Sequence, residues 1–526
     1  MNIPIEEIEF NDEFKRALDI MEHTNRHVFI TGKAGTGKST LLEYFRSITT
    51  KNIVVLAPTG VAALNVNGET IHSFFKFGPD ITPDRVKRMS GYGSNIYKSI
   101  DAIVIDEISM VRADLMDCID RFMRLNGPDR NAPFGGVQMI MIGDLYQLPP
   151  VVRSAEKQLF RKCYKSEYFF DAKVFQEIDF EFVELEKVYR QKDPVFIEIL
   201  NQIRSNTITD ETLELLNSRV GAELPGGSEY TVYLTTTNAM AREINERNLD
   251  MLKGRRYRFV AEVEGEFDEK SYPTDYELIV KKGAQVMMLN NDSYGRWVNG
   301  TIGRVVRVRR DRESGQRVIE VEFTDGRIEE VEPFTWDLFH YYYDEEDGKI
   351  KTETIGTFTQ YPIKLAWAIT IHKSQGKTFD QVVIDIGRGT FAHGQVYVAL
   401  SRCRSLEGIS LVKPIKKKHI FMDYRIVRFL RELKLRESEL DMDERIRLIE
   451  EAIENGNYIE MVYLKGSNER THRVVRPLSL GTESFRGREF LGMRAYCTMR
   501  RAERMFRVDR IISMRVLSPE EAEALE

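Results

Sequence analysis

Short apolar segments alternate with helix-like segments through the first 150 residues. The apolar segments are rich in β-branched residues: "HVFITG" (27–32), "NIVVLAP" (52–58), "DAIVIDE" (101–107) and "VQMIMIGD" (137–144). Continuous apolar strands that alternate with helices indicate a parallel sheet covered on both faces. A second strand-and-helix group runs from about 180 to 290 and resumes at 363–371. The pattern therefore predicts an α/β protein with two such domains.

A different pattern separates the two halves of the second group. "GTIGRVVRVRRDRESGQRVIEVEFTDGRIEEVEP" alternates apolar and polar residues and has turn signals at Ser314-Gly315 and Asp325-Gly326. Strict alternation with such turns is typical of antiparallel hairpins, so we expect a small β unit inserted into the second α/β domain.

These patterns predict two α/β domains, the first over 1–180 with a small insertion at 78–98, and the second over 181–290 and 358–430. The β insertion is expected over 291–357. A charged helical linker over 431–440 leads to a third unit over 441–526, with one helix at 444–455 followed by strands.

Size, composition, charge and cysteine content narrow the class of protein further. The 526 residues are too many for one core, and 42% hydrophobic with 30% charged residues is ordinary for a core-forming protein. The formal charge of −6 does not by itself indicate a polyanionic partner, although a local groove can still be positive. The four cysteines stand singly and form no C-x-x-C pair, which favours a reducing compartment. With an acidic start and no bilayer-length apolar run, we expect a cytoplasmic protein.

The segment "GKAGTGKST" (32–40) fits the phosphate-binding pattern G-x-x-x-x-G-K-[ST] and lies between a predicted strand and a predicted helix. Its glycines allow successive backbone N–H groups to face a phosphate. Lys38 supplies a charge to the β- and γ-phosphates, and Ser39 offers a hydroxyl to Mg²⁺. The expected nucleotide contacts are Gly32, Ala34, Gly35, Thr36, Gly37, Lys38, Ser39 and Thr40.

A second signal is "AIVIDEIS" (102–109), an apolar strand that ends in two carboxylates. Asp106 would hold Mg²⁺, and Glu107 can act as a general base on the attacking water. Acids often end strands, so the pair is informative only together with the phosphate loop. The two motifs together predict hydrolysis of ATP or of nucleoside triphosphates more broadly.

Five further segments carry a resemblance to a known family: "APTGVAALNVNGETIHSFF" (57–75), "GDLYQLPPV" (143–151), "LEKVYRQ" (185–191), "AITIHKSQGKTFDQV" (368–382) and "VYVALSRCRSLEGISLV" (396–412). In this order they resemble the Pif (petite integration frequency) family of DNA helicases, in superfamily 1B beside the RecD helicases. The resemblance covers residues 20–425. It implies two RecA-like domains that bind ATP between them and translocate 5′→3′ on single-stranded DNA.

The resemblance also implies roles for individual residues. Gln147 would sense the γ-phosphate, Arg190 and Arg402 would reach the phosphates across the cleft, and Gln375-Gly376 would lie near the γ-phosphate. The family's DNA-contacting positions correspond to Thr59, Gly60, Thr70, His72, Thr236, Thr370, His372, Lys373 and Ser374. For His72 and His372, the alternative is a structural histidine in a satisfied hydrogen-bond network.

The sequence departs from the family in some places. The upstream glutamine that reads adenine has no clear equivalent, and Phe14 stands where it would be sought. Residues 78–98 occupy the position of the strand-separating wedge without a diagnostic feature, and the β insertion resembles the SH3-like insertion of the superfamily.

The C-terminal unit resembles the WYL domain, a small Sm-like β-barrel of bacterial nucleic-acid-responsive regulators, although Glu489-Phe490-Leu491 replaces the naming tripeptide. Between residues 461 and 515 there are 13 basic residues against five acids. Arginines among aromatic residues fit a single-strand-binding surface. The candidate residues are Arg473, Arg476, Arg494, Arg500, Arg507 and Arg510. A solvated basic face or a protein-docking module is the alternative.

The sequence therefore predicts an ATP- and Mg²⁺-dependent 5′→3′ DNA helicase. We expect a monomer that acts on single-stranded, tailed or forked DNA, with G-quadruplexes as a further substrate and the bacterial nucleoid as its location. Two alternatives stay open. One is a DNA-stimulated ATPase subunit of a RecD-like recombination complex, and the other is a ligand-sensing regulator gated by the WYL-like unit.

Overall fold

The computed structural model describes residues 10–89, 95–152, 156–191, 193–225, 229–310, 315–387, 389–390, 392–436, 440–466, 468–485, 488–517 and 521. Its contacts divide the chain into two compact units. Unit 1 holds residues 1–204 and 208–421, and unit 2 holds 422–526 together with 205–207. Residues 90–94 of the predicted wedge, Ser314 of the predicted turn and 437–439 of the predicted linker lie outside the described residues.

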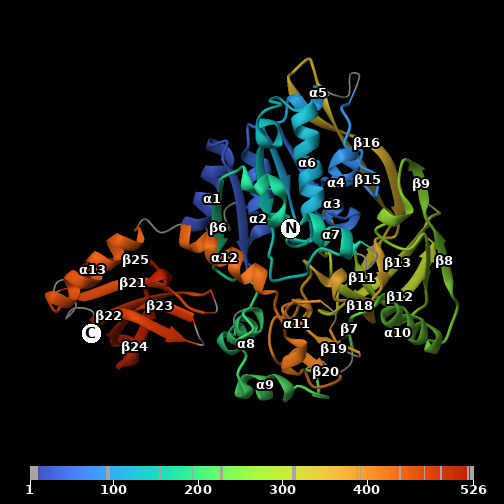
Figure 1. Ribbon diagram of the computed structural model, residues 1–526. Coiled ribbons are helices and arrows are strands. Elements are labelled where there is room, and N and C mark those ends of the chain that lie inside the picture. Colours follow the sequence, from blue (N-terminus) through green and yellow to red (C-terminus); the bar gives the residue numbers. More distant parts are fainter. Residues whose placement is uncertain are drawn as a thin grey trace. The chain divides into compact units, whose positions relative to one another are not determined.

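The first sheet of unit 1, whose edge strand β6 is labelled in Figure 1, has six parallel strands in the order β3-β2-β4-β5-β1-β6. The strands are β1 (His27–Gly32), β2 (Ile53–Ala57), β3 (Glu69–Thr70), β4 (Ala102–Ile105), β5 (Gln138–Ile142) and β6 (Phe180–Leu185). The helices of this part are α1 (Asp12–His23), α2 (Lys38–Ile48), α3 (Gly60–Asn65), α4 (Ile71–Phe74), α5 (Asn95–Lys98), α6 (Ala113–Asn126) and α7 (Lys157–Cys163).

The central strands are buried on both faces, which is why their sequences are continuously apolar. Helices α1 and α2 share one hydrophobic core with β1, β4 and β5, through side chains such as Phe14, Leu41 and Phe45. Because all six strands are parallel, their carboxyl ends meet at one edge of the sheet. The phosphate loop, Asp106 and Asp144 follow three of these ends.

One domain boundary differs from the prediction. Strand β6 pairs in parallel with β1, from His27 opposite Phe180 to Gly32 opposite Leu185. The first sheet therefore continues past residue 180, where we expected the second domain to start. The segment "FEFVEL" has the composition of any buried strand, so only its pairing partner decides which sheet it joins.

The second sheet is also parallel, with the order β18-β7-β19-β20. Its strands are β7 (Val232–Thr235), β18 (Ala368–Thr370), β19 (Val382–Asp385) and β20 (Ile409–Leu411). The accompanying helices are α8 (Pro194–Arg204), α9 (Asp210–Asn217), α10 (Asn238–Met251) and α11 (Gln395–Leu400). One hydrophobic core joins α8 and α11 to this sheet. Two parallel sheets with helices match the predicted pair of RecA-like domains.

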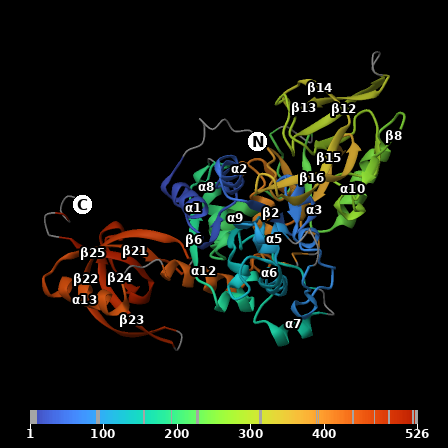
Figure 2. The same ribbon diagram turned by 90° about the horizontal axis from the view of Figure 1, so that it is seen from above.

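An antiparallel region separates β7 from β18, as expected, but it is longer than the predicted 291–357. It contains a five-stranded sheet in the order β14-β13-β12-β11-β17, a three-stranded sheet β15-β16-β9 and the pair β10-β8 (Figure 2). The strands are β8 (Tyr257–Val260), β9 (Glu262–Gly265), β10 (Glu277–Val280), β11 (Gln285–Met288), β12 (Ile302–Arg310), β13 (Arg317–Phe323), β14 (Ile328–Val331), β15 (Phe334–Asp344), β16 (Lys349–Gln360) and β17 (Ile363–Leu365).

The insertion thus includes β8 to β11 and β17, which the sequence pattern assigned to the second α/β domain. These strands are three or four residues long, too short for alternation to distinguish antiparallel from parallel pairing. The predicted turn at Asp325-Gly326 is present: Gly326 has φ +81° and donates its N–H to the carbonyl of Phe323.

The β15–β16 hairpin packs against the edge of the first sheet. The Tyr341 hydroxyl accepts a 3.1 Å hydrogen bond from the backbone N–H of Val55 on β2. The His340 Nδ1 lies 3.3 Å from the carboxylate of Glu69 on β3, which is fully buried. Two polar side chains of the hairpin therefore add partners for buried groups near the edge of the first sheet; Glu69 also accepts from the Ser73 hydroxyl at 2.6 Å.

Unit 2 contains helices α12 (Tyr424–Arg436) and α13 (Met442–Glu454) and one antiparallel sheet in the order β24-β23-β22-β21-β25. The strands are β21 (Tyr458–Leu464), β22 (Arg470–Phe485), β23 (Arg488–Cys497), β24 (Ala502–Arg507) and β25 (Ile511–Leu517). Helix α13 is the predicted leading helix, and it shares a core with the sheet through Ile449 and Ala452. The Lys434 ammonium on α12 donates to the carbonyl of Asn468, so residues predicted as a linker belong to this unit.

Among the described residues, no helix combines the length and the apolar character that crossing a bilayer requires.

Candidate nucleotide and nucleic-acid site

The phosphate loop connects β1 to α2 with the backbone conformation that its glycines allow. Gly35 and Gly37 have φ +82° and +88°, in the left-handed region that other residues rarely adopt. A Cβ on Gly35 would lie 2.5 Å from the Cβ of Arg190, so only glycine fits there. Around Gly37 a Cβ would meet no atom within 4 Å, and its importance lies in its backbone angle. The loop ends at the start of α2, where free N–H groups favour an anion.

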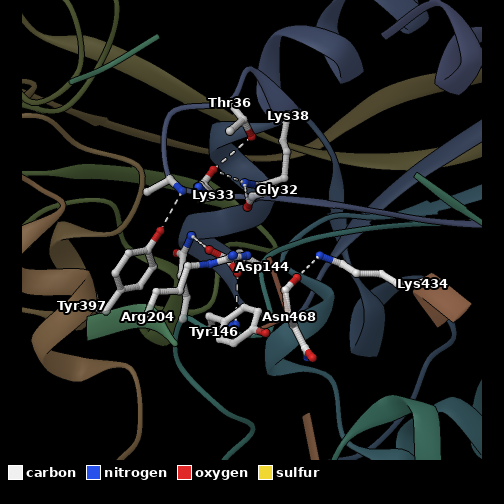
Figure 3. A network of polar contacts seen from close by, with 12 residues as sticks. Gly32, Lys33, Thr36, Lys38, Asp144, Tyr146, Arg204, Tyr397, Lys434 and Asn468 are labelled. Atoms are coloured by element: carbon white, nitrogen blue, oxygen red, sulfur yellow. Dashed lines mark hydrogen bonds and ion pairs between the residues drawn. The ribbon is translucent and has the colours of Figure 1, made fainter. Parts of the chain in front are cut away.

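The Lys38 side chain folds back over this loop. Its ammonium donates to the carbonyls of Gly32 and Lys33, at 2.8 and 3.0 Å (Figure 3). Burial lowers the pKa of Lys38, although the carboxylates of Asp144 and Glu107 partly oppose the shift. A buried cation with two neutral carbonyls as partners is well placed to exchange them for phosphate oxygens.

Asp106 and Glu107 follow β4 directly and are both deeply placed. Burial raises the pKa of Asp106, and Lys38 partly opposes this. The pKa of Glu107 is raised to about 7, first by burial and then by the neighbouring charge of Asp106. Glu107 has φ +50°, an uncommon value for a residue with a Cβ, which turns the backbone sharply after the strand. A carboxyl group with a pKa near neutrality is suited to general-base chemistry.

Polar side chains that follow β5 are hydrogen-bonded to one another and to a residue that follows β18 of the second sheet. Gln147 donates from Nε2 to the buried carboxylate of Asp144 at 3.3 Å. Gln375, which follows the short 3₁₀ turn His372–Ser374 after β18, donates from Nε2 to the Gln147 Oε1 at 3.2 Å. The two predicted glutamines are therefore in direct contact, although 228 residues separate them.

Arg190 and Arg402 approach the phosphate loop together. Arg402 is 1% exposed, and its guanidinium donates to the Val398 carbonyl and the Ser401 hydroxyl. Its pKa is lowered to about 9 by burial and by the charge of Arg190. Arg190 packs against Gly35 and donates to the Ser401 carbonyl at 3.4 Å. Two positive groups in one buried place favour the binding of an anion between them.

The position of Arg190 refines the prediction that both arginines come from the opposite domain. Arg190 lies in the segment that leaves β6, and Tyr189 next to it donates its N–H to the Gly35 carbonyl. Arg190 is thus carried by the connection between the two sheets, whereas Arg402 follows α11 of the second domain.

Two residues that the sequence did not single out complete the site (Figure 3). The hydroxyl of Tyr397 on α11 accepts from the buried N–H of Ala34 at 3.1 Å. The guanidinium of Arg204 at the end of α8 lies 3.4 Å from Asp144 and 4.0 Å from the ring centroid of Tyr146. Tyr397 lies within the quoted segment 396–412, so that motif could have indicated it, but no local signal marks Arg204.

The predicted DNA-contacting residues of the first domain surround α3 and α4. Thr59 and Thr70 are the N-caps of these helices, and each hydroxyl accepts a backbone N–H. Gly60 lies against Ser271 of the insertion, where a Cβ would come within 2.7 Å of the hydroxyl. His72 on α4 is partly exposed, and its pKa is lowered by burial and by Arg112.

The corresponding residues of the second domain divide into two groups. Lys373 is exposed and His372 is partly exposed. Thr370 and Ser374 are buried; Ser374 donates to the Ile371 carbonyl at 2.7 Å and Thr370 accepts the Lys373 N–H. These two hydroxyls therefore shape the turn in this conformation, whereas we expected them to face a DNA backbone. Thr236 is also buried, with its hydroxyl 3.8 Å from the Met240 sulfur.

The adenine-reading position of the family has no replacement at Phe14. That side chain is buried, and its ring lies against Phe10 and Tyr44, with centroids 5.5 and 6.4 Å away. Beside the phosphate loop there is a small, shallow pocket lined by Ala34, Leu200, Tyr397 and Ser401, among other residues.

The residues proposed for magnesium have suitable chemistry. Ser39 is exposed in the first turn of α2 and Asp106 ends β4, which provides one hydroxyl and one carboxylate. In the described part of the chain, no three His, Cys, Asp or Glu side chains form a group that could hold a metal by themselves. Mg²⁺ is usually bound through one or two protein groups together with substrate phosphates and water, so this pair fits.

Three of the six candidate arginines of unit 2 share one face of its sheet. Arg476 on β22 pairs with Tyr496 on β23, and Arg494 lies two residues before Tyr496. Arg507 on β24 pairs with Gly492, so all three point away from the core side chains Met493 and Ala495. The other three candidates, Arg473, Arg500 and Arg510, lie on β22 and in the two short 3₁₀ turns 498–500 and 508–510, off this face.

Known proteins resemble both parts of the chain. A family model described as PIF1-like helicase matches residues 9–214, and a WYL domain model matches residues 444–516. The ATP-dependent DNA helicase Pif1 of Bdellovibrio bacteriovorus is 32% identical over 441 residues, which cover 82% of this chain and 93% of that protein.

Solved structures agree with the helicase match. The structure of Bacteroides sp. Pif1 in complex with ADP-AlF4 has 39% identity and a TM-score of 0.74, covering 81% of this chain and 98% of that chain. Bacteroides Pif1 bound to single-stranded DNA has 38% identity and a TM-score of 0.59, covering 81% and 97%.

Proposed function

Because the chain belongs to the PIF1-like helicases, we propose that it is a DNA helicase that hydrolyses ATP to move 5′→3′ along single-stranded DNA and separate duplexes. The observation that carries this proposal is the approach of Tyr397, Gln375 and Arg402 to the strand ends of the first sheet. Tyr397 bonds the Ala34 N–H of the phosphate loop, Gln375 bonds Gln147 after β5, and Arg402 lies close enough to Glu107 for their charges to interact. All three come from the second domain, while the loop belongs to the first. A nucleotide bound at the loop would therefore contact both domains, and its hydrolysis would change how they fit together.

The residues suggest how the chain acts on ATP. Lys38 would bind the β- and γ-phosphates, and Glu107 would accept a proton from the attacking water. Arg190 and Arg402 would neutralise charge on the transferring phosphoryl group, an effect of about 10³–10⁵ in rate for arginine fingers. A magnesium ion held by Ser39 and Asp106 would add positive charge at the same phosphates. Gln147 and Gln375 are hydrogen-bonded to each other, so a contact with the γ-phosphate would affect both domains.

The DNA would lie across both domains. Thr59, Thr70 and His72 would contact its backbone from the first domain, and His372 and Lys373 from the second. Contacts to phosphates hold a strand without reading its sequence, as a motor that crosses every sequence requires. The structure of a 38% identical relative bound to single-stranded DNA supports this choice of polymer.

The test is unwinding of duplexes with a 5′ or a 3′ single-stranded tail by the purified chain. We expect ATP-dependent unwinding of the 5′-tailed substrate only, and none by Lys38→Ala. Unwinding of the 3′-tailed substrate would contradict the direction, and an active Lys38→Ala variant would contradict the mechanism. DNA-stimulated ATP hydrolysis without unwinding would favour the alternative, a subunit of a RecD-like complex.

Further properties follow from the same proposal. We propose a monomeric enzyme of the bacterial cytoplasm and nucleoid that acts on tails, forks and G-quadruplexes in replication, repair or recombination. Analytical ultracentrifugation checks the oligomeric state, and unwinding rates on matched substrates rank the DNA structures.

A second proposal concerns unit 2. Its outward face has three arginines, and the Arg507 guanidinium lies 4.8 Å from the ring centroid of Phe490, an arrangement that suits stacking and phosphate contacts. We propose that this face binds single-stranded nucleic acid. Deleting residues 441–526 should weaken single-strand affinity and flatten its salt dependence. Unchanged binding across a salt series would leave a ligand-gated regulator or a protein-docking module as the better explanation of this unit.

A further inference from the structure

Three lysines of the second domain and the insertion gather beside the predicted DNA path without acidic partners. Lys364 lies on β17, Lys373 lies in the turn after β18, and Lys377 follows four residues later. Within the described residues, none of the three forms an ion pair with a carboxylate. Ammonium groups that lie near one another repel, and a bound anion would relieve this repulsion.

The backbone geometry places Lys364 near Lys377. Lys364 pairs with Met287 on β11, and the adjacent Met288 exchanges backbone hydrogen bonds with Gly300 and Thr301. The Lys377 side chain lies against Gly300, where a Cβ would be 3.5 Å from the Lys377 Cβ. The pKa of Lys364 is lowered to about 7, first by burial and then by the charges of Lys377 and Lys373; the exposed Asp275 only weakly opposes this. Burial also lowers the pKa of Lys377 to about 8. Both side chains are partly buried, and neither ammonium group is paired with a carboxylate in the part of the chain that the structure describes.

Two hydrogen bonds in sequence connect Lys377 to the first domain. The Lys377 ammonium donates to the Oδ1 of Asn299, at 2.5 Å, and the Asn299 side chain donates to Asn65 at the end of α3. Helix α3 begins directly after Thr59, one of the predicted DNA contacts. Lys377 is thus connected to the helix that Thr59 caps.

The segment that contains Lys373 and Lys377 also contacts Arg402 of the predicted nucleotide site. The Arg402 guanidinium lies within hydrogen-bond distance of the Ser374 and Lys377 carbonyls, at 3.5 and 3.4 Å. An anion that pulls on the Lys377 side chain would therefore also affect the Lys377 carbonyl, which Arg402 contacts.

We propose that Lys364, Lys373 and Lys377 form one binding site for a backbone phosphate of single-stranded DNA. This rests on the proposed helicase function and adds Lys364 and Lys377 to the contacts assigned above. We choose a phosphate as the anion because lysine ammonium groups, unlike the planar guanidinium of arginine, impose no fixed two-pronged geometry. Three of them can donate to the oxygens of a tetrahedral phosphate from several sides. The site would hold the strand on the second domain while its carbonyl groups remain in contact with Arg402.

The experiment measures binding of a fluorescein-labelled oligo(dT) strand by anisotropy in a salt series at pH 7. Lys364→Met, Lys377→Met and the double variant are compared with Lys253→Met, which removes the same charge from an exposed position. Each cluster substitution should weaken binding and reduce the slope of log K against log salt by up to about 0.7, the value for one phosphate contact on a single strand. The Lys253→Met control should keep the wild-type slope.

A pH series separates this site from a structural role. A bound phosphate raises the pKa of Lys364, so the free protein must take up a proton on binding above pH 7. Wild-type affinity should then fall as the pH rises from 7 towards 9, by at most about tenfold per pH unit for one proton. Lys364→Arg, which stays protonated, should bind with a flatter profile over pH 7–8. It also replaces the methionine variant if melting shows that variant to be unfolded.

The outcomes are distinct. Wild-type slopes and wild-type pH profiles in the Lys364 and Lys377 variants would overturn the lysine site. A wild-type protein that does not bind the strand at all would instead overturn the proposed helicase function.

Discussion

The guanidinium of Arg204 lies 3.4 Å from the carboxylate of Asp144, which is fully buried. Burial lowers the pKa of Arg204, but the Asp144 carboxylate, together with Tyr397, Tyr146 and Glu184, outweighs this, so the net shift is upward. Asp144 follows a strand of the first sheet, and Arg204 ends a helix of the second domain. One buried ion pair therefore joins the two domains next to the phosphate loop.

Breaking this pair should be costly. Arg204→Met leaves the Asp144 charge buried and unpaired, which typically costs about 3–5 kcal/mol of stability. We expect a clear loss in the free energy of unfolding by urea. Arg256→Met is the matched control, because its ion pair with Asp250 is exposed and such pairs contribute about 0–1 kcal/mol. Equal losses in the two variants would show that the buried pair adds nothing.

The raised pKa of Glu107 predicts the pH dependence of hydrolysis. A general base must be deprotonated, so kcat/KM for ATP in the presence of single-stranded DNA should rise with pH through about 7 and then level off. Glu107→Gln should lose about 10²–10⁴-fold in rate and should not show this rise. A Glu107→Gln variant with the wild-type rate and pH profile would rule out the assigned role.

The same carboxyl group predicts a change in stability. Its pKa is higher in the folded protein than in the unfolded chain, so Glu107 opposes folding once the pH exceeds the unfolded value, increasingly up to about 7. Glu107→Gln should therefore raise the melting temperature more at pH 8 than at pH 4. Melting curves at the two pH values check this, and a pH-independent shift would contradict it.

Tyr397 should stabilise the phosphate loop before nucleotide binds. Tyr397→Phe leaves the buried N–H of Ala34 without its partner, at a cost of about 1–3 kcal/mol. The measurement is urea unfolding without nucleotide. Tyr276→Phe is the control, because Tyr276 is 49% exposed. A Tyr397→Phe variant as stable as the control would show that the loop does not depend on this hydroxyl.

Arg402→Lys should lower the rate of ATP hydrolysis sharply, towards the 10³–10⁵-fold range for loss of an arginine finger, because lysine cannot reproduce the planar fork. Nucleotide affinity, measured with a fluorescent ADP analogue, should change much less than kcat. With a pKa of about 9, Arg402 is still charged at pH 7, so protonation does not limit this role. Equal losses in affinity and rate would instead indicate a purely structural residue.

The sequence by itself determined those parts of the site that one strand and its next turn can build. The glycines of the phosphate loop, Lys38 and the Asp106-Glu107 pair work through backbone angles and strand ends, which are local properties. Parallel pairing then places these strand ends together at one edge, as predicted. The alternating pattern also located the antiparallel insertion, although not its limits.

Only the tertiary structure decided which distant residues complete the site. The pairing of β6 with β1, the contact of Tyr397 with Ala34 and the ion pair of Arg204 with Asp144 depend on where the chain returns after many residues. The tertiary structure also decided the environment of Thr370 and Ser374, whose hydroxyls are buried. Local patterns state what a residue can offer, whereas long-range packing determines which partner it meets and how much water remains around it.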